Sequence, residues 1–302
     1  MTHSDTRPVP PPHSGGGGPC ERSTRERVRE KHGGGGGSTT DVSAPSTASL
    51  RSAVPLPRSA SLTGDEPVLL HHALRLGDDA LILGQRLSEW CGHAPMLEVD
   101  LALANIGLDL LGQATHFLNL AGEIEGKGRD ADALAFHRDV LDFRNCLLVE
   151  QPNGDFAQTI ARQFLFSNWQ ELLMREIAQA PQPRLSAIGA KAVKEIAYHA
   201  KFASEWVVRL GDGTEESRAR MIAGLDWMWR FVDELFDAKD GAPSHRAEWA
   251  ARIARALTEA GLELPKPRRG AMGGRAGHHS EHLGHLLTEM QFLQRAYPGA
   301  TW

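Results

Sequence analysis

Two short stretches, Leu108-Asp109-Leu110-Leu111-Gly112 and Lys194-Glu195-Ile196-Ala197-Tyr198-His199, decide the fold class of this chain. In each of them a carboxylate interrupts an apolar run that has the spacing of a helix. Acidic side chains inside a set of apolar helices are typical of helical bundles that hold two metal ions between their helices. The chain is therefore expected to be an all-α bundle with acidic positions on the inner faces of its helices.

The histidines that should accompany these carboxylates are missing. A carboxylate-bridged di-iron site needs Glu-x-x-His on each of two helices, because side chains at i and i+3 share one helical face. Here the i+3 positions are Gly112 and Tyr198. Glycine has no ligand atom, and a phenol is an unusual substitute for imidazole. His199 follows one residue later, a rotation of ~100° around the helix, so we expect it not to point with Glu195 into one site.

The lone carboxylates of such a bundle lie on the preceding helices, roughly thirty residues upstream. Counting back from Asp109 reaches Asp78 and Asp79, but counting back from Glu195 reaches Ala161-Arg162-Gln163, which holds no carboxylate. Three carboxylate ligands can thus be argued, one is absent and both histidines are replaced. The predicted degenerate di-iron positions, at which we expect no bound metal, are Asp79, Asp109, Gly112, Glu195 and Tyr198.

A buried polar network is the prediction for the side chains left at this place. Hydrogen bonds and ion pairs from neighbouring helices would fill the volume of the metals and neutralise the carboxylates. The alternative, in which each side chain faces solvent singly, is disfavoured for Asp109 because leucines precede and follow it. The residues assigned to the network, beside Asp79, Asp109 and Glu195, are Arg86, Asn105, Gln113, His116, Arg162 and Gln163.

A second polar cluster lies near the C-terminus, in Gly277-His278-His279-Ser280-Glu281-His282-Leu283-Gly284-His285, followed by Glu289. His278 and His282 are four residues apart, as are His285 and Glu289, which is a spacing that metal ligands use. The two pairs fall on different faces of a helix. We therefore favour a helix N-terminus capped by Ser280 and packed on a partner, and keep a metal site as the alternative.

Composition divides the 302 residues into two parts. Residues 1–64 contain glycine runs at 15–18 and 33–37 together with many Pro, Ser and Arg residues, a composition that cannot bury enough apolar surface to fold. We expect a disordered tail over 1–64 and one helical domain over 65–302. The chain is acidic, with a formal net charge of -5, which argues against a nucleic-acid surface.

Cysteine usage and hydropathy set the expected location. Three cysteines are scattered without paired spacing, which is typical of a reducing cytoplasm. No apolar run approaches the ~18 residues that a membrane span needs. We therefore expect a cytoplasmic protein.

Helical periodicity predicts where the helices lie, with Asp130 and Thr214 as N-caps and a turn at Gln151-Pro152-Asn153-Gly154. On the second helix, which starts beside Pro95, the expected apolar stripe is Leu97, Leu101, Ala104, Leu108, Leu111 and Leu118. The first helix is expected to carry a stripe that ends at Cys91. Apart from the second helix, the expected spans are Pro67–Cys91, Asp130–Leu148, Asp155–Gln179, Arg184–Leu210, Thr214–Asp237, Ser244–Ala260 and Ser280–Ala296.

With these residues assembled, the body of the chain resembles the C subunits of bacterial phenylacetyl-CoA 1,2-epoxidases. The resemblance covers about 65–302 and leaves out the tail. Its most specific stretches are Leu76–Pro95, Asp100–Gln113, Leu148–Asp155, Lys191–His199, Arg209–Ser217 and His279–Gln291.

The resemblance implies a ferritin-like bundle with additional C-terminal helices and a structural, non-catalytic role. Such a subunit pairs with a catalytic A subunit, which carries the di-iron centre and, in aerobic phenylacetate catabolism, converts the ring of phenylacetyl-CoA to a 1,2-epoxide. It implies a reductase with FAD and an iron–sulfur cluster that delivers electrons from NADPH, small accessory subunits, and no cofactor in this chain. Nucleic acid and membranes are not among the implied partners.

Two other functions remain open at this point. One is a catalytic metal-dependent oxygenase that uses a partial bundle site or the C-terminal His/Glu cluster. The other is an iron-storage bundle, which the missing ligands disfavour. The metal content of the purified chain would separate both from a structural subunit.

Overall fold

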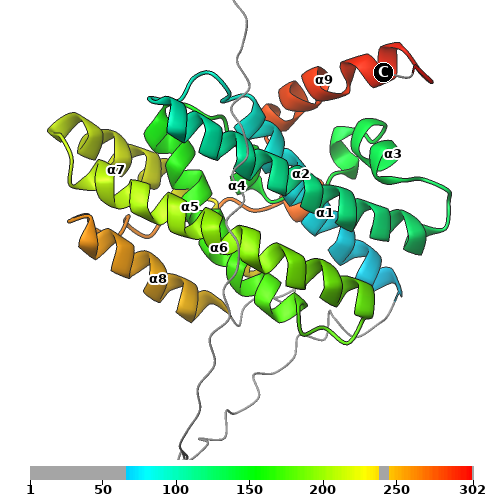
Figure 1. Ribbon diagram of the computed structural model, residues 1–302, viewed down its shortest axis with the longest axis horizontal. Coiled ribbons are helices and arrows are strands. Elements are labelled where there is room, and N and C mark those ends of the chain that lie inside the picture. The colour runs from blue at the N-terminus through cyan, green and yellow to red at the C-terminus, as the bar shows by residue number, and fades with distance from the viewer. Residues whose placement is uncertain (1–65, 238–244, 301–302) are drawn as a thin grey trace, which may run out of the picture. The chain divides into compact units, whose positions relative to one another are not determined.

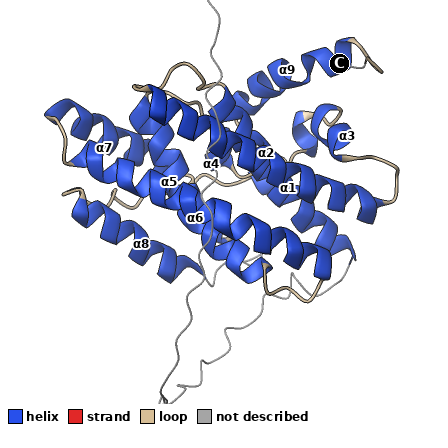
Figure 2. Cartoon of the chain, in the orientation of Figure 1, coloured by secondary structure: helices blue, strands red, loops and turns tan. Residues whose placement is uncertain are grey.

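The computed structural model describes residues 66–237 and 245–300, so the expected tail, residues 1–64, lies outside the described residues. Within those ranges the secondary structure is helical and contains no strand (Figures 1 and 2). The expected all-α class is confirmed. None of the helices in the described ranges combines the length and apolarity that crossing a membrane requires.

Four long helices form the central bundle: α1 (Glu66–Ser88), α2 (Leu97–Glu125), α5 (Phe156–Ile177) and α6 (Pro183–Gly211). The chain forms two helical hairpins, α1 with α2 and α5 with α6, and α2 of the first hairpin also contacts α6 of the second. The predicted spans of α5 and α6 agree with the structure within two residues at each end. Local caps explain the agreement: the Asp155 carboxylate accepts the Gln158 N–H at 2.9 Å where α5 begins.

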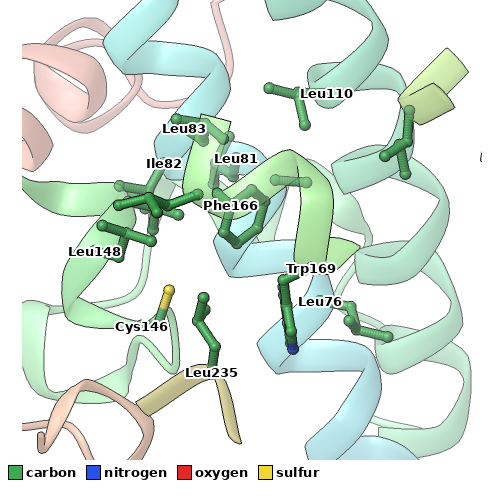
Figure 3. Packing of buried hydrophobic residues seen from close by; sticks show 14 of the residues in the cluster. Leu76, Leu81, Ile82, Leu83, Leu110, Cys146, Leu148, Phe166, Trp169 and Leu235 are labelled. Atoms are coloured by element: carbon green, nitrogen blue, oxygen red, sulfur yellow. The ribbon is translucent and has the colours of Figure 1, made fainter. Parts of the chain in front are cut away.

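Helix α1 is buried all round over its middle turns, contrary to the single apolar stripe that we expected. Every residue from 75 to 84 is buried, including Asp78 and Asp79. Cys91, the expected end of the stripe, lies beyond the helix and is exposed. Figure 3 shows the apolar packing around α1, with Leu110 of α2 and Trp169 of α5 among the neighbouring side chains. Because these turns are enclosed on every side, charged side chains are buried with the apolar ones, which a single apolar stripe does not predict.

Helix α2 agrees with the predicted apolar stripe only in part, because Leu118 is buried as expected and Leu111 is partly buried. Leu97, Leu101 and Leu108, which belong to the expected core stripe, are 69%, 55% and 65% exposed. The helix has apolar residues on both sides, so periodicity alone does not select the buried side. Contact with α1 and α6 makes the selection. The large apolar residues that α2 does bury are Val99, Leu103, Ile106, Leu110, Phe117, Leu118 and Leu120.

The third expected helix, Asp130–Leu148, is broken into three pieces: α3 (Ala131–Phe136), η2 (Val140–Asp142) and α4 (Leu147–Glu150). The predicted cap is present, because the Asp130 carboxylate accepts the Ala133 N–H at 2.8 Å. Further on, two carboxylates of α1 accept backbone N–H groups that would otherwise bond to carbonyls within a helix. Asp78 accepts the N–H of Arg144 and Asp79 accepts the N–H of Cys146, each at 2.8 Å. These bonds replace helical ones and hold the connection open.

The C-terminal third adds shorter helices to the bundle. Helix α7 (Glu215–Trp229) begins after the predicted Thr214 cap and gives way to η3 (Val232–Phe236), short of the expected end at Asp237. Helix α8 (Arg246–Glu259) follows, then the short η6 (Gly274–Ala276) and α9 (Glu281–Ala296). The additional C-terminal helices that we expected are therefore present.

Candidate functional site

The polar residues of α2 and α6 meet across the line where these two helices touch. Nε2 of His199 lies 3.0 Å from Oδ2 of Asp109, and Gln113 donates to Oε2 of Glu195 at 3.0 Å. On each helix the two residues are four apart, so they share a face. The expectation that His199 and Glu195 point apart is wrong. The side chain that faces outward is Tyr198, which is 49% exposed.

On α2 the predicted ligand position, Gly112, also faces away from the interior. A Cβ atom placed on Gly112 would meet no atom within 4 Å. Positions 112 and 198 therefore both face away from the interior, and the inward positions are those of Gln113 and His199. The i+4 partner of each acidic residue, rather than the i+3 partner, completes its face.

The electrostatics of this contact favour a neutral imidazole. His199 is fully buried, and burial lowers its pKa more than the hydrogen bond and charge of Asp109 raise it. Its Nδ1 has no hydrogen-bond partner within the part of the chain that the structure describes. The Asp109 side chain is 38% exposed. This carboxylate is thus held on its inner side by His199 while its other side is open to solvent.

The two carboxylates of α1 are paired with arginines from elsewhere in the chain. Asp78 forms a buried ion pair with Arg138; burial raises the pKa of Asp78, although Arg138 acts to lower it. Oδ2 of Asp79 lies 2.7 Å from Nη2 of Arg275, with side-chain exposures of 1% and 7%. Burial acts to lower the pKa of Arg275, but the charge of Asp79 and its acidic surroundings outweigh it, and the pKa is raised. Each α1 carboxylate is therefore neutralised by its own arginine.

The single network that we predicted is divided into separate local clusters. Arg86 donates through Nη2 to the carbonyl of Glu150 at 2.7 Å. Arg162 donates to the carbonyl of Gln151 at 2.5 Å, and burial lowers its pKa to about 9. These arginines bind the turn after α4, because its backbone carbonyls lie within their reach.

Other members assigned to the network lie outside it or bind locally. Asn105 is exposed, and His116 is exposed and lies 3.2 Å from Nζ of Lys191. Gln163 donates to the hydroxyl of Ser167 on its own helix at 2.7 Å. The assignments of Asn105 and His116 to a buried network are wrong.

A buried polar pair, His279 with Glu150, was missed from the sequence. Nδ1 of His279 lies 2.8 Å from Oε2 of Glu150, and its Nε2 lies 3.0 Å from the carbonyl of Phe143. Both neighbours are acceptors, so both ring nitrogens donate and the ring is an imidazolium. Burial acts to lower the pKa of His279, but the hydrogen bond and charge of Glu150 outweigh it, and the pKa is raised. His279 and the turn after Glu150 were both visible in the sequence, but nothing local indicates that they meet.

The C-terminal cluster does not assemble. His278, His285 and Glu289 are exposed, whereas His282 is half-buried. Across the described ranges, no group of three or more His, Cys, Asp and Glu residues is placed to hold a metal ion. Ser280 does occupy the N-cap position of α9, but its side chain makes no capping bond.

A di-iron centre does not fit the donor set of the bundle. Such a centre needs several anionic ligands and imidazoles that converge on two ions. Here the inward carboxylates are already bound to Arg138, Arg275, His199 and Gln113. Within residues 66–237 and 245–300, these side chains supply hydrogen bonds and ion pairs and leave no vacant set of ligands.

Comparison with known proteins shows the family of the chain. Residues 57–302 match the family described as phenylacetic acid catabolic protein, whose name, PaaA_PaaC, joins two proteins. The chain belongs to this family. Its fold is accordingly a ferritin-like helical bundle. The chain is also 50% identical, over 246 residues, to the C subunit of the 1,2-phenylacetyl-CoA epoxidase of Escherichia coli K12, in a match that spans 78% of this chain and 99% of the relative.

Proposed function

We propose that this chain is the non-catalytic structural subunit of a multicomponent phenylacetyl-CoA 1,2-epoxidase in aerobic phenylacetate catabolism. In this proposal it pairs with the A subunit, which carries the di-iron centre, and stabilises it. A reductase with FAD, an iron–sulfur cluster and NADPH, together with small accessory subunits, completes the complex. The protein works in the cytoplasm and holds no cofactor itself.

The observation that carries the proposal is the pairing of the inward carboxylates. Asp79 is bound to Arg275 and Asp109 to His199, while Glu195 accepts from Gln113. Freeing any of them for a metal would leave its partner unpaired in the interior, which costs about 1–3 kcal/mol for a neutral group and more for a charge. Relatedness to a protein named as the C subunit of an epoxidase supports the same conclusion.

Two measurements test the proposal. Elemental analysis of the purified chain should find no stoichiometric iron. Oxidation of phenylacetyl-CoA by the A subunit, with reductase and NADPH, should be weaker or shorter-lived without this chain than with it. Two irons per chain would overturn the structural role, and so would an A subunit that is equally active and stable alone.

Variants at the degenerate positions separate structure from chemistry. Asp79→Asn and Glu195→Gln remove a charge where a di-iron bundle would place a ligand, while keeping side-chain size. Complexes that contain these variants and still assemble should retain turnover. If assembled complexes lose all activity while the A subunit keeps its iron, this chain takes part in the reaction.

A further inference from the structure

The outer side of α2 has the pattern of a helix–helix seam although no helix of the described residues covers it. Leu97, Leu101, Asn105, Leu108 and Gly112, which we call the α2 outer stripe, follow one another at intervals of three or four residues. That spacing keeps them on one side of the helix. The three leucines are each more than half exposed, and Asn105 is exposed as well.

We propose that a helix of the catalytic A subunit packs lengthwise along the α2 outer stripe. The inference rests on the proposed function and deepens it by naming the contacting face. An apolar helical stripe with one asparagine is the arrangement by which paired helices bind and fix their register. The stripe runs from position 97 to 112, a length of about 22 Å.

Gly112 sets how close the partner can approach. The space where its side chain would stand is open, so the backbone of α2 is bare at this point of the stripe. Small residues at a seam allow two helices to come close together. The contact at Gly112 is therefore expected to be the tightest of the interface.

Charge beside the glycine indicates what the partner helix carries. Asp109 is 38% exposed, and the buried His199 holds its inner oxygen. A carboxylate fixed in this way presents its outer oxygen in a set direction. A Lys or Arg of the partner would form a charge-assisted hydrogen bond with it.

Neighbouring α6 widens the apolar surface. Tyr198 precedes His199, the residue that contacts Asp109, and is about half exposed. The centres of the Tyr198 and Phe202 rings are 6.1 Å apart. The centres of permanent interfaces are rich in apolar and aromatic side chains. The family name, which joins PaaA and PaaC, favours a partner built from helices like these.

The test measures binding of the A subunit to two variants of the full chain. Leu108→Glu puts a charge in the middle of the stripe. Gly112→Leu fills the bare point, where an added Cβ atom would meet no atom of this chain within 4 Å. Each should raise the dissociation constant for the A subunit by about 30-fold or more, the effect of losing an interface hot spot. Leu108→Glu should leave the thermal unfolding of the isolated chain unchanged or nearly so, and Gly112→Leu should not lower it, because glycine is a poor helix former.

Leu141→Glu is the matched control. Leu141 lies on η2 and is 71% exposed, compared with 65% for Leu108. The same substitution there should change the dissociation constant by less than about threefold, as expected of a residue outside an interface. Isothermal titration with the A subunit, together with sedimentation of each chain alone, provides the readouts.

The outcomes distinguish this inference from the proposed function. If the wild type binds the A subunit and both stripe variants bind equally well, the interface lies elsewhere and only the present inference fails. If the wild type alone forms a dimer that Leu108→Glu abolishes, the stripe binds a second copy of this chain and the inference is overturned. If the wild type does not bind the A subunit at all, the proposed function fails and the inference fails with it.

Discussion

Replacing Arg275 by methionine should destabilise the protein strongly, because it leaves Asp79 charged and alone in the interior. The two groups are 2.7 Å apart and almost completely buried. At an effective dielectric constant of 20, this separation corresponds to an attraction of about 6 kcal/mol, part of which offsets the cost of desolvating both charges. Removing one member of such a pair costs about 3–5 kcal/mol.

The loss should be visible in both urea and thermal unfolding. For a domain of this size each kcal/mol shifts the midpoint by about 2–4 °C, so the Arg275→Met variant should melt roughly 6–20 °C below the wild type. The double variant Asp79→Asn/Arg275→Met should recover about half of the loss or more, since a buried pair replaced on both sides is often tolerated. The asparagine oxygen can still accept the N–H of Cys146.

A surface ion pair provides the control. Arg268 and Asp226 are 2.6 Å apart, with side chains 45% and 39% exposed. Arg268→Met should cost less than about 1 kcal/mol, because water already solvates both charges. The buried pair does not stabilise the fold in this way if Arg275→Met costs no more stability than Arg268→Met. The same conclusion follows if the double variant loses as much stability as Asp79→Asn and Arg275→Met lose together.

Three further predictions concern other parts of the chain. The raised pKa of His279 stabilises the wild type fully below the ordinary histidine pKa of 6.5, and this stabilisation is lost as the pH rises through the pKa of the folded state. His279→Gln should therefore lower the free energy of unfolding most at low pH. In denaturant titrations from pH 5 to 9, a difference from wild type that widens toward pH 9 would contradict this. Gly122→Ala should lower the free energy of unfolding in urea by about 1–3 kcal/mol or more, because its Cβ would lie 1.9 Å from the carbonyl oxygen of Arg129. Gly112→Ala on the same helix should instead stabilise the protein by about 0.5–1 kcal/mol. Equal effects at both positions would refute this steric explanation. Deleting residues 1–64 should change unfolding by no more than about 0.5 kcal/mol, since their composition supplies no core; a larger loss, or failure to bind the A subunit, would show that the segment packs on the protein.

Local signals in the sequence determined the helices that begin and end by local chemistry. The predicted N-caps are present, because the side chains of Asp130 and Thr214 each accept the N–H three residues further along the chain. Asp155, at the expected start of a helix, does the same. The turn at Gln151–Gly154 separates α4 from α5 as expected. Caps and turns depend on a few neighbouring residues, so they can be predicted from the sequence alone.

The buried side of α2 was decided by the tertiary structure. Leucines stand on both of its sides, and only packing against α1 and α6 determines that Leu103 and Leu110 go inside while Leu108 stays outside. The same choice turns Gly112 outward, and the packing of α6 does the same for Tyr198. A ligand pattern at i+3 could not reveal this. Positions i+3 and i+4 lie on either side of residue i, about 60° and 40° away around the helix, and only packing determines which of them faces inward.

The partners of the buried charges also depended on the tertiary structure. The sequence showed that acidic residues stand in apolar helices and that a complete ligand set is absent, because residue types and spacing are local facts. It did not show that Asp79 meets Arg275 or that Glu150 meets His279, since these pairs join distant parts of the described chain. Electrostatic attraction acts between any opposite charges, and only the folded path of the backbone brings particular ones together.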